Sequence, residues 1–170
     1  GANGIHHGSF RHERGDATLD TEKGYALDFK ATYHKNNWDI ALTPYAYYFD
    51  NYIFLKPSGQ FSILPHGGQI YQYSQSKALL TGFEVNVQKR FTDQFNAFVI
   101  YEYIYNRQLT EDNELGNYLP FTPPSTLFSK LNYSIDQPIS IFNDIEFNVN
   151  GRYAFEQKNI AQNEEMTKDY

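Results

Sequence analysis

Cysteine is missing from this 170-residue chain, and methionine and tryptophan occur only once each. Without cysteine the fold can have neither a disulfide framework nor a thiolate metal site. No segment approaches the roughly 20 consecutive apolar residues that a membrane-spanning helix needs. These absences exclude a helical membrane protein and a cysteine-stapled domain, and they leave both soluble and membrane β-structures open.

Positive charge is also scarce, with 14 Lys and Arg against 20 Asp and Glu and a formal net charge of -6. Nucleic acid is disfavoured as a partner, because phosphate recognition requires a basic patch and the sequence contains none. No glycine-rich phosphate loop leads from a strand into a helix, and no sustained helical period occurs. Nucleotide binding therefore has no support.

Aromatic residues make up 18% of the chain, although its mean hydropathy is -0.62. They belong to stretches in which apolar and polar residues alternate with period two, most clearly over 25–34, 95–106 and 139–156. A pleated strand points alternate side chains to opposite faces, so the alternation predicts strands whose two faces meet different environments. About ten such residues suffice to cross a membrane as a tilted strand.

Short turns and long polar segments alternate between the six expected strands. The strands are expected at 23–34, 37–50, 69–91, 95–107, 126–134 and 139–157, with a bend at Gly82. The turns 34–37, 92–94 and 136–138 are short, whereas the segments 1–22, 51–68, 108–124 and 158–170 are long. This alternation is typical of an antiparallel up-and-down transmembrane β-barrel, which has short periplasmic turns and long extracellular loops. Six strands predict an open segment of such an all-β barrel.

Aromatic rings crowd the outer ends of two of the expected strands. We expect them to form a girdle at the level of the lipid headgroups, as in other outer-membrane barrels. A soluble core or a carbohydrate-stacking face is the alternative. The rings concerned are Tyr45, Tyr47, Tyr48, Phe49, Tyr52, Phe54, Tyr101, Tyr103 and Tyr105.

The N-terminal segment resembles the approach to a late barrel strand in TonB-dependent outer-membrane receptors. The family pattern has arginine, glutamate, glycine, leucine and glutamate where this chain has Arg11, Glu13, Gly15, Leu19 and Glu22. The chain departs from the pattern at Asp16, Ala17 and Thr21, which replace asparagine and two prolines. Further landmarks resemble the family at 51–53, 72–73, 82–84, 119–124 and 163–170, so the resemblance covers nearly the whole chain.

The resemblance implies that residues 1–170 are a C-terminal part of a barrel of about 22 strands, without its plug, its earlier strands and its last strands. Such receptors lie in the outer membrane of Gram-negative bacteria. They import scarce ligands, namely iron chelates (siderophores), haem, cobalamin or oligosaccharides, with energy that TonB passes to the plug. The implied partners are outer-membrane lipid, the plug, the remaining strands, TonB through the plug, and the imported ligand. No enzymatic activity and no cofactor is implied.

Two groups of polar residues are candidates for functional roles. On the outer segments, ligand contacts are expected from His6, His7, Arg11, His12, Glu13 and His66. Adjacent side chains of an extended segment point to opposite sides, so neighbouring histidines do not readily chelate one ion, and no metal site is predicted. On the strands, lumen-facing positions are expected at Glu84, Asn86, Glu102, Glu146, Asn148 and Arg152.

These polar and charged residues are assigned to the lumen because an Arg or Lys that faces lipid at mid-depth destabilises a barrel by about 2–4 kcal/mol. Glu102 and Glu146 have no nucleophile or oxyanion site beside them in the sequence, so catalysis is not expected. Two alternatives stay open. A small complete outer-membrane barrel with an adhesin or structural role requires a closed sheet, and a soluble carbohydrate-binding β-domain requires buried aromatic faces.

Overall fold

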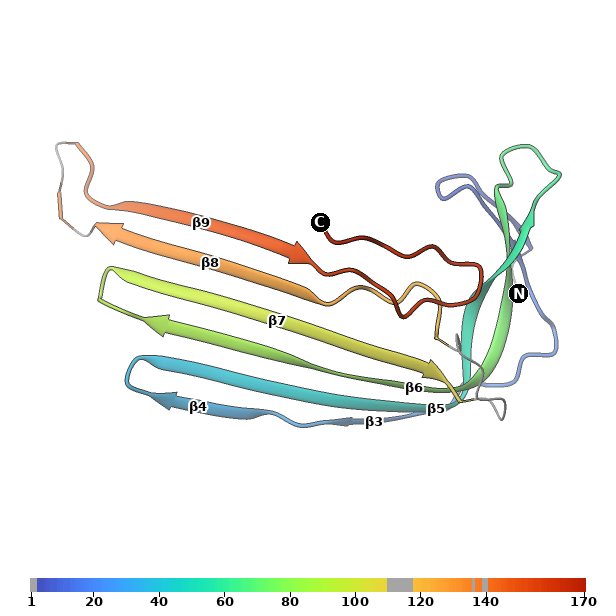
Figure 1. Ribbon diagram of the computed structural model, residues 1–170, viewed down its shortest axis with the longest axis horizontal. Helices are drawn as coiled ribbons and strands as arrows, with labels where there is room; N and C mark the ends of the chain where they lie inside the picture. The colour runs from blue at the N-terminus through green and yellow to red at the C-terminus, as the bar shows by residue number, and fades with distance from the viewer. Residues whose placement is uncertain (1–2, 110–117, 136, 139–140) are drawn as a thin grey trace.

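The computed structural model describes residues 3–109, 118–135, 137–138 and 141–170, and these residues form an all-β sheet of nine strands (Figure 1). In this part of the chain no helix is long and apolar enough to cross a membrane. The strands are β1 (Gly4–His6), β2 (Arg11–Arg14), β3 (Gly24–Asp28), β4 (Ala31–Lys35), β5 (Trp38–Phe61), β6 (Gln69–Arg90), β7 (Phe95–Gln108), β8 (Thr126–Ile135) and β9 (Ile145–Ala154).

The long strands form an antiparallel wall in which β3 and β4 both pair with β5, followed by β6, β7, β8 and β9. β3 and β4 lie end to end in one continuous register on β5, because Asp28 pairs with Tyr45 and Ala31 with Leu42. Between them Phe29 donates its N–H to the Pro44 carbonyl at 3.1 Å, but Pro44 has no N–H to return. The expected strand 23–34 is therefore one geometric strand with a hydrogen bond missing at the proline.

Three connections lie at one end of the wall, which we name the turn end; the opposite end is the loop end (Figure 1). β4 and β5 meet through Asn36 and Asn37, whose φ angles of 52° and 63° give the left-handed pair typical of a type I′ hairpin. Residues 91–94 join β6 to β7. The third connection runs from the end of β8 at Ile135 to the start of β9 at Ile145, so the described part of β9 begins later than the expected strand 139–157. Residues 136, 139 and 140 of the expected turn and strand lie outside the described residues.

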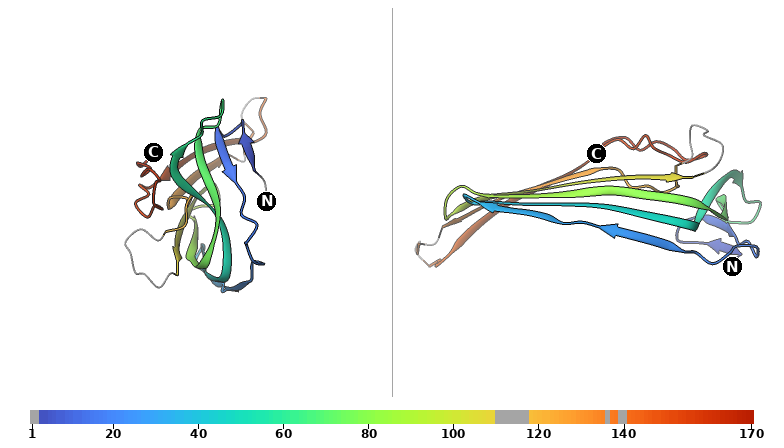
Figure 2. Two further views of the ribbon diagram at one scale, coloured as in Figure 1. Left: turned by 90° about the vertical axis from the view of Figure 1, so that its right-hand side faces the viewer. Right: turned by 90° about the horizontal axis from the view of Figure 1, so that it is seen from below.

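β5 continues past residue 50 to Phe61, so most of the loop expected at 51–68 is strand and only 62–68 connect β5 to β6. The register with β6 shifts between Phe49 and Tyr52 and again between Pro57 and Phe61. Such bulges accommodate proline and unpaired residues within a strand. The β5–β6 hairpin projects beyond the wall at the loop end and bends away from it (Figures 1 and 2).

The segment expected as a loop at 1–22 also contains strands. β1 and β2 form an antiparallel hairpin, and β2 pairs in parallel with the outer end of β6, where Arg11 lies opposite Gln69. At this end β5 pairs with one edge of β6 and β2 pairs with the other edge. Further along β6, toward the turn end, β7 pairs with the edge that β2 occupies here. These short strands carry too few residues for an alternating pattern to stand out.

The strand registers align an apolar face across the whole wall. Its residues on the edge strands are strongly exposed, for example Leu27 at 72% and Val149 at 68%, and those on the central strands are partly exposed. The opposite face is mainly polar, so the alternation predicted from the sequence becomes two continuous surfaces. One row of directly paired residues on the apolar face is Ala31, Leu42, Val85, Tyr101, Leu127 and Tyr153.

The aromatic girdle expected from the sequence is wrong for part of its residues. Tyr48, Tyr101, Tyr103 and Tyr105 lie on the apolar face, but the registers place the other five rings of the expected girdle on the polar face. Some of them have partners there: the Tyr47 hydroxyl donates to Asp28 Oδ1 at 2.8 Å, and others form a small apolar cluster with Ala78 and Leu119. The polar-face rings are Tyr45, Tyr47, Phe49, Tyr52 and Phe54.

Gly82 marks a close approach rather than the expected bend, since the β5–β6 register runs through it without a shift. A Cβ at this position would overlap the carbonyl oxygen of Tyr103 and the hydroxyl of Tyr45. The glycine thus leaves room for the Tyr45 ring, which stacks on Tyr47 with 5.2 Å between ring centroids. A larger residue would force these strands apart.

Candidate ligand-binding site

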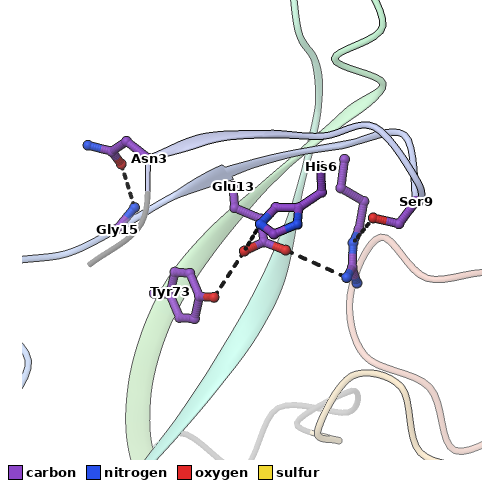
Figure 3. A network of polar contacts seen from close by, with 7 residues as sticks. Asn3, His6, Ser9, Glu13, Gly15 and Tyr73 are labelled. Atoms are coloured by element: carbon purple, nitrogen blue, oxygen red, sulfur yellow. Dashed lines mark hydrogen bonds and ion pairs between the residues drawn. The ribbon is translucent and has the colours of Figure 1, made fainter.

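A buried carboxylate organises the N-terminal hairpin. Glu13 in β2 is only 4% exposed, and its Oε2 accepts a hydrogen bond from the Tyr73 hydroxyl at 2.9 Å (Figure 3). Arg11 Nη2 lies 3.6 Å from Glu13 Oε1, and His6 Nε2 lies 3.4 Å from Oε2. A buried charge is tolerated when several donors compensate its lost hydration. Glu13 thereby ties β1, β2 and β6 together.

Polar contacts close both ends of the hairpin (Figure 3). At the turn, Arg11 Nε donates to Ser9 Oγ at 3.1 Å, and Phe10 adopts a left-handed φ of 48°. At the open end, the Gly15 N–H donates to Asn3 Oδ1 at 2.6 Å. The guanidinium of Arg11 is therefore held in place by Ser9 and Glu13 together, which orients it before any ligand arrives.

The hairpin docks on the loop 62–68. His12 Nδ1 lies 2.9 Å from Ser62 Oγ, and the imidazoles of His7 and His66 face one another with 6.3 Å between ring centroids. A Cβ at Gly68, whose φ is 56°, would overlap the carbonyl of Phe10. The glycine is needed for this contact. The hairpin and the loop thus form one surface.

Segments late in the chain reach the same place. The Arg11 guanidinium carbon lies 5.6 Å from the ring centroids of both Tyr71 and Phe121. The Phe121 N–H donates to Glu164 Oε1 at 2.6 Å, and Asn163 Nδ2 donates to the Pro57 carbonyl at 3.2 Å. The side chain of Arg11 remains 31% exposed. A cation between two rings can bind an anionic or aromatic ligand.

Residues 15–22 cross from the hairpin to β3 over the β5–β6 extension. Gln75 makes two hydrogen bonds with the backbone of Asp20. Its Oε1 accepts from the Asp20 N–H at 2.9 Å, and its Nε2 donates to the Asp20 carbonyl at 2.8 Å. Glu22 Oε2 accepts the Ile53 N–H at 2.8 Å. The first outer segment is therefore anchored along its length rather than only at the hairpin.

The hydrogen bond to Glu13 raises the pKa of Tyr73 above its ordinary value, and burial adds to the shift. A raised pKa keeps the phenol protonated, so it stays a donor to the carboxylate throughout the neutral range.

The residues expected to face the lumen all lie on the polar face, in two separate groups. Glu84 pairs directly with Glu102, and both border a hollow of about 220 Å³ that Arg152 also lines. Asn86 Nδ2 donates to Glu84 Oε1 at 2.5 Å, and Thr126 Oγ1 donates to Glu102 Oε2 at 2.7 Å. Two carboxylates that face each other across strands repel unless a cation joins them.

The second group lies toward the turn end. Asn132 Nδ2 donates to Glu146 Oε1 and, at 3.0 Å, to Asn148 Oδ1. These side chains form an amide and carboxylate row across β8 and β9, well separated along the strands from Glu84 and Glu102. The polar face therefore has no single constellation that contains all the expected residues.

Several residues of the outer site were not expected from the sequence. Tyr73, Ser62, Tyr71 and Phe121 lie roughly 50 or more positions from the hairpin residues that they contact. No local pattern signals such pairs, although Tyr73 was already a landmark of the resemblance. In the described residues, no group of three or more His, Cys, Asp or Glu side chains could hold a metal ion.

A family model described as "TonB dependent receptor-like, beta-barrel" matches residues 2–170. The chain belongs to this family. It is therefore part of a barrel of the Gram-negative outer membrane, and its relatives are transporters rather than enzymes. The resemblance and the fold class inferred from the sequence are confirmed. No curated protein matches the sequence.

Two solved structures share the fold at low sequence identity. The copper transporter OprC superposes with a TM-score of 0.71 at 16% identity, over 92% of this chain and 24% of that one. The siderophore receptor PirA from Pseudomonas aeruginosa gives 0.51 at 16% identity, over 87% of this chain and 26% of that one. The chain thus spans about a quarter of the length of these structures.

Proposed function

We propose that residues 1–170 form one part of the barrel wall of a receptor that imports a scarce ligand, with energy supplied through TonB and a plug domain. The single observation that supports this most strongly is the pair of continuous faces, one apolar and one polar, that the registers carry across every strand from β3 to β9. A wall between lipid and a wet lumen requires this arrangement.

The dimensions of the apolar face support its contact with lipid. On β5 it runs from Trp38 to Tyr48, which at about 3.3 Å per residue is about 33 Å along the strand. A strand tilted by roughly 40° then spans about 25 Å of membrane, the height of the apolar band of outer-membrane barrels. Aromatic residues at both ends of this span match the positions of interfacial rings.

The polar face supports contact with a plug. Glu84 and Glu102 lie opposite each other on a hollow that Arg152 also lines, so this part of the polar face presents both carboxylates and a guanidinium to a plug. We likewise propose that Asn86, Glu146, Asn148 and Arg152 face the lumen. The plug, TonB through the plug, the remaining strands and outer-membrane lipid are the partners that the family implies.

Among the ligands that we infer from the family, an iron chelate fits the outer site best. Arg11, held between Tyr71 and Phe121, offers a positive charge beside aromatic faces, which suits an anionic chelating group. His6 lies beside the same Glu13 carboxylate that holds Arg11, whereas His12 points to the other side of β2 and contacts Ser62. His7 and His66 lie near each other, one in the hairpin turn and one in the loop 62–68. Haem, cobalamin and oligosaccharide are the other ligand classes to be compared.

The two alternative functions are less well supported. A soluble carbohydrate-binding domain would bury its aromatic faces, whereas Tyr25 and Phe29 on the apolar face are each 64% exposed. A small complete barrel would close on itself, whereas in the described residues the wall runs from β3 and β4 to β9 and these two edges do not pair with each other. The open wall is the arrangement that agrees with a larger barrel.

The test is uptake by the full receptor in a Gram-negative strain that lacks competing receptors. Labelled ferric chelates, haem, cobalamin and oligosaccharides are compared with and without TonB. We expect one class, a ferric chelate, to accumulate only when TonB is present, with Arg11→Ala raising the half-saturating concentration. Arg14→Ala, at the exposed end of β2, is the matched control. Accumulation without TonB, or no uptake of any class, would contradict the proposal.

A further inference from the structure

Four histidines meet at the loop end, and two of them have polar partners. His6 lies beside Glu13, and His12 lies beside Ser62. His7 and His66 instead face one another, with 6.3 Å between ring centroids and an angle of 58° between ring planes. Both residues are exposed to solvent. An ion can therefore reach the space between them directly.

The distance between these rings is close to that of two imidazoles on one metal. A tetrahedral zinc ion with nitrogen ligands at 2.0–2.1 Å holds the two ring centres about 5 Å apart. The two ring centres must move about 1 Å closer together to reach this distance. Side-chain rotation allows this movement, because the rotamers of exposed residues interconvert readily. The adjacent histidines His6 and His7 cannot share an ion in an extended strand, but His66 reaches His7 from another loop.

We propose that His7 and His66 together bind a divalent late first-row transition metal, such as zinc, nickel or copper, with water completing its coordination. Neutral imidazole is a preferred ligand of these ions. The ion would connect the turn of the β1–β2 hairpin to the loop 62–68, two segments that otherwise meet through the His12–Ser62 contact and the packing of Phe10 on Gly68. It is a structural ion of the outer surface and is not itself the ligand that the receptor imports.

The consequence is a loop surface whose order depends on metal. An ion that binds only the docked arrangement stabilises it by mass action, so zinc at ten times its dissociation constant makes undocking about tenfold rarer. Arg11 sits in the same hairpin, and its position between Tyr71 and Phe121 would become more persistent. The metal would thus preorganise the outer site.

Hydrogen exchange of the full receptor in detergent, followed by mass spectrometry with and without zinc chloride, tests this. We expect zinc to slow exchange about tenfold in peptides covering 4–14 and 62–68. His7→Gln and His66→Asn should each abolish the effect. Asparagine suits the left-handed φ of 60° at position 66, so this variant removes the imidazole and keeps the backbone.

Controls separate the bridge from other histidine effects. His34→Ala removes a histidine at the turn end, beside Asp39, and should leave the zinc effect intact. Exchange of each variant without zinc should equal that of the unsubstituted receptor, which shows that the hairpin still docks. Zinc protection that persists in His66→Asn, or no protection at saturating zinc, would overturn the proposal. Uptake is measured separately, so failure here would leave the transport function unaffected.

Discussion

At the scale of single residues, Glu13 illustrates how one buried charge can organise a loop. Its carboxylate has three partners on three different strands, and it is almost completely removed from water. Hydrogen bonds to charged groups are stronger than neutral ones, and an unsatisfied buried donor is costly. The hairpin should therefore depend on the charge of this residue more than on its shape.

Glu13→Gln keeps the shape and removes the charge. We expect docking of the hairpin to weaken by about 1–3 kcal/mol, because the Arg11 guanidinium loses its counter-charge and the Tyr73 hydroxyl loses a charged acceptor. Hydrogen exchange in residues 4–14 measures the change. Glu156→Gln is the control, since its ion pair with Lys158 is exposed and worth little. Equal exchange in both variants would contradict the role of Glu13.

Gly82→Ala tests the close approach in the middle of the wall. The added methyl group would meet the Tyr103 carbonyl, which is backbone and cannot rotate away, so we expect a loss of about 1–3 kcal/mol. The measurement is the thermal midpoint of unfolding of the full receptor, which is followed by the change in gel mobility between the folded and the unfolded barrel. Gly151→Ala has no atom within 4 Å of the new Cβ and should leave the midpoint unchanged. The idea fails if both variants melt alike.

Sequence reasoning identified residues at this scale better than it identified their contacts. Arg11 and Glu13 were singled out, and the structure places them together, but their partners Tyr73 and Phe121 come from a distant strand and a distant loop. A contact across 60 positions depends on strand register, which local patterns do not encode. The roles proposed for these side chains in ligand binding remain predictions.

At the scale of the elements, alternation and turn chemistry were sufficient for the strands inside the wall. β6 and β7 lie within one residue of their expected bounds, because period-two patterning marks a strand with two different faces. The bounds of two other strands were wrong: β5 runs on to Phe61, and the described part of β9 spans only Ile145–Ala154 of the expected strand 139–157. β5 runs through Pro57 and Gly59 by means of bulges, so residues that usually end a strand failed to end this one.

The turn between β4 and β5 offers a test of element geometry. Asn36 and Asn37 both have positive φ, a conformation that other non-glycine residues adopt at a cost of about 1–2 kcal/mol. We expect Asn37→Gly to preserve or slightly raise the refolding yield of the receptor in lipid and Asn37→Ala to lower it. Equal yields for the two variants would show that this hairpin does not depend on a type I′ turn.

At the scale of the whole molecule, the chain is a wall with an apolar and a polar face rather than a domain around a core. The buried apolar cluster is small, with Phe54, Ala78 and Leu119 as its buried members. Beside β9 the chain continues the sheet, because Ala154 and Tyr170 exchange backbone hydrogen bonds at 2.8 and 3.1 Å. A small core of this kind agrees with a part of a larger barrel that is stabilised by contact with lipid and with neighbouring strands.

Adjacent substitutions on β5 compare the two faces. Leu42→Arg places a cation on the apolar face at mid-height, and we expect a loss of about 2–4 kcal/mol in the unfolding free energy of the receptor in bilayers. Ala41→Arg points into a hollow near Asp39, Asn86 and Gln88, where a cation is solvated, so its effect should be much smaller. Similar losses would argue against different environments for the two faces.

A nitroxide scan of β7 tests the central claim most directly. The chain has no cysteine, so single cysteines introduced at positions 97–104 of a full receptor free of other cysteines can each carry a spin label. We predict high oxygen accessibility, which reports lipid, at Ala97, Val99, Tyr101 and Tyr103, and low accessibility at the even positions between them. Accessibility without a period of two, or with the opposite phase, would contradict a wall whose apolar face meets the membrane.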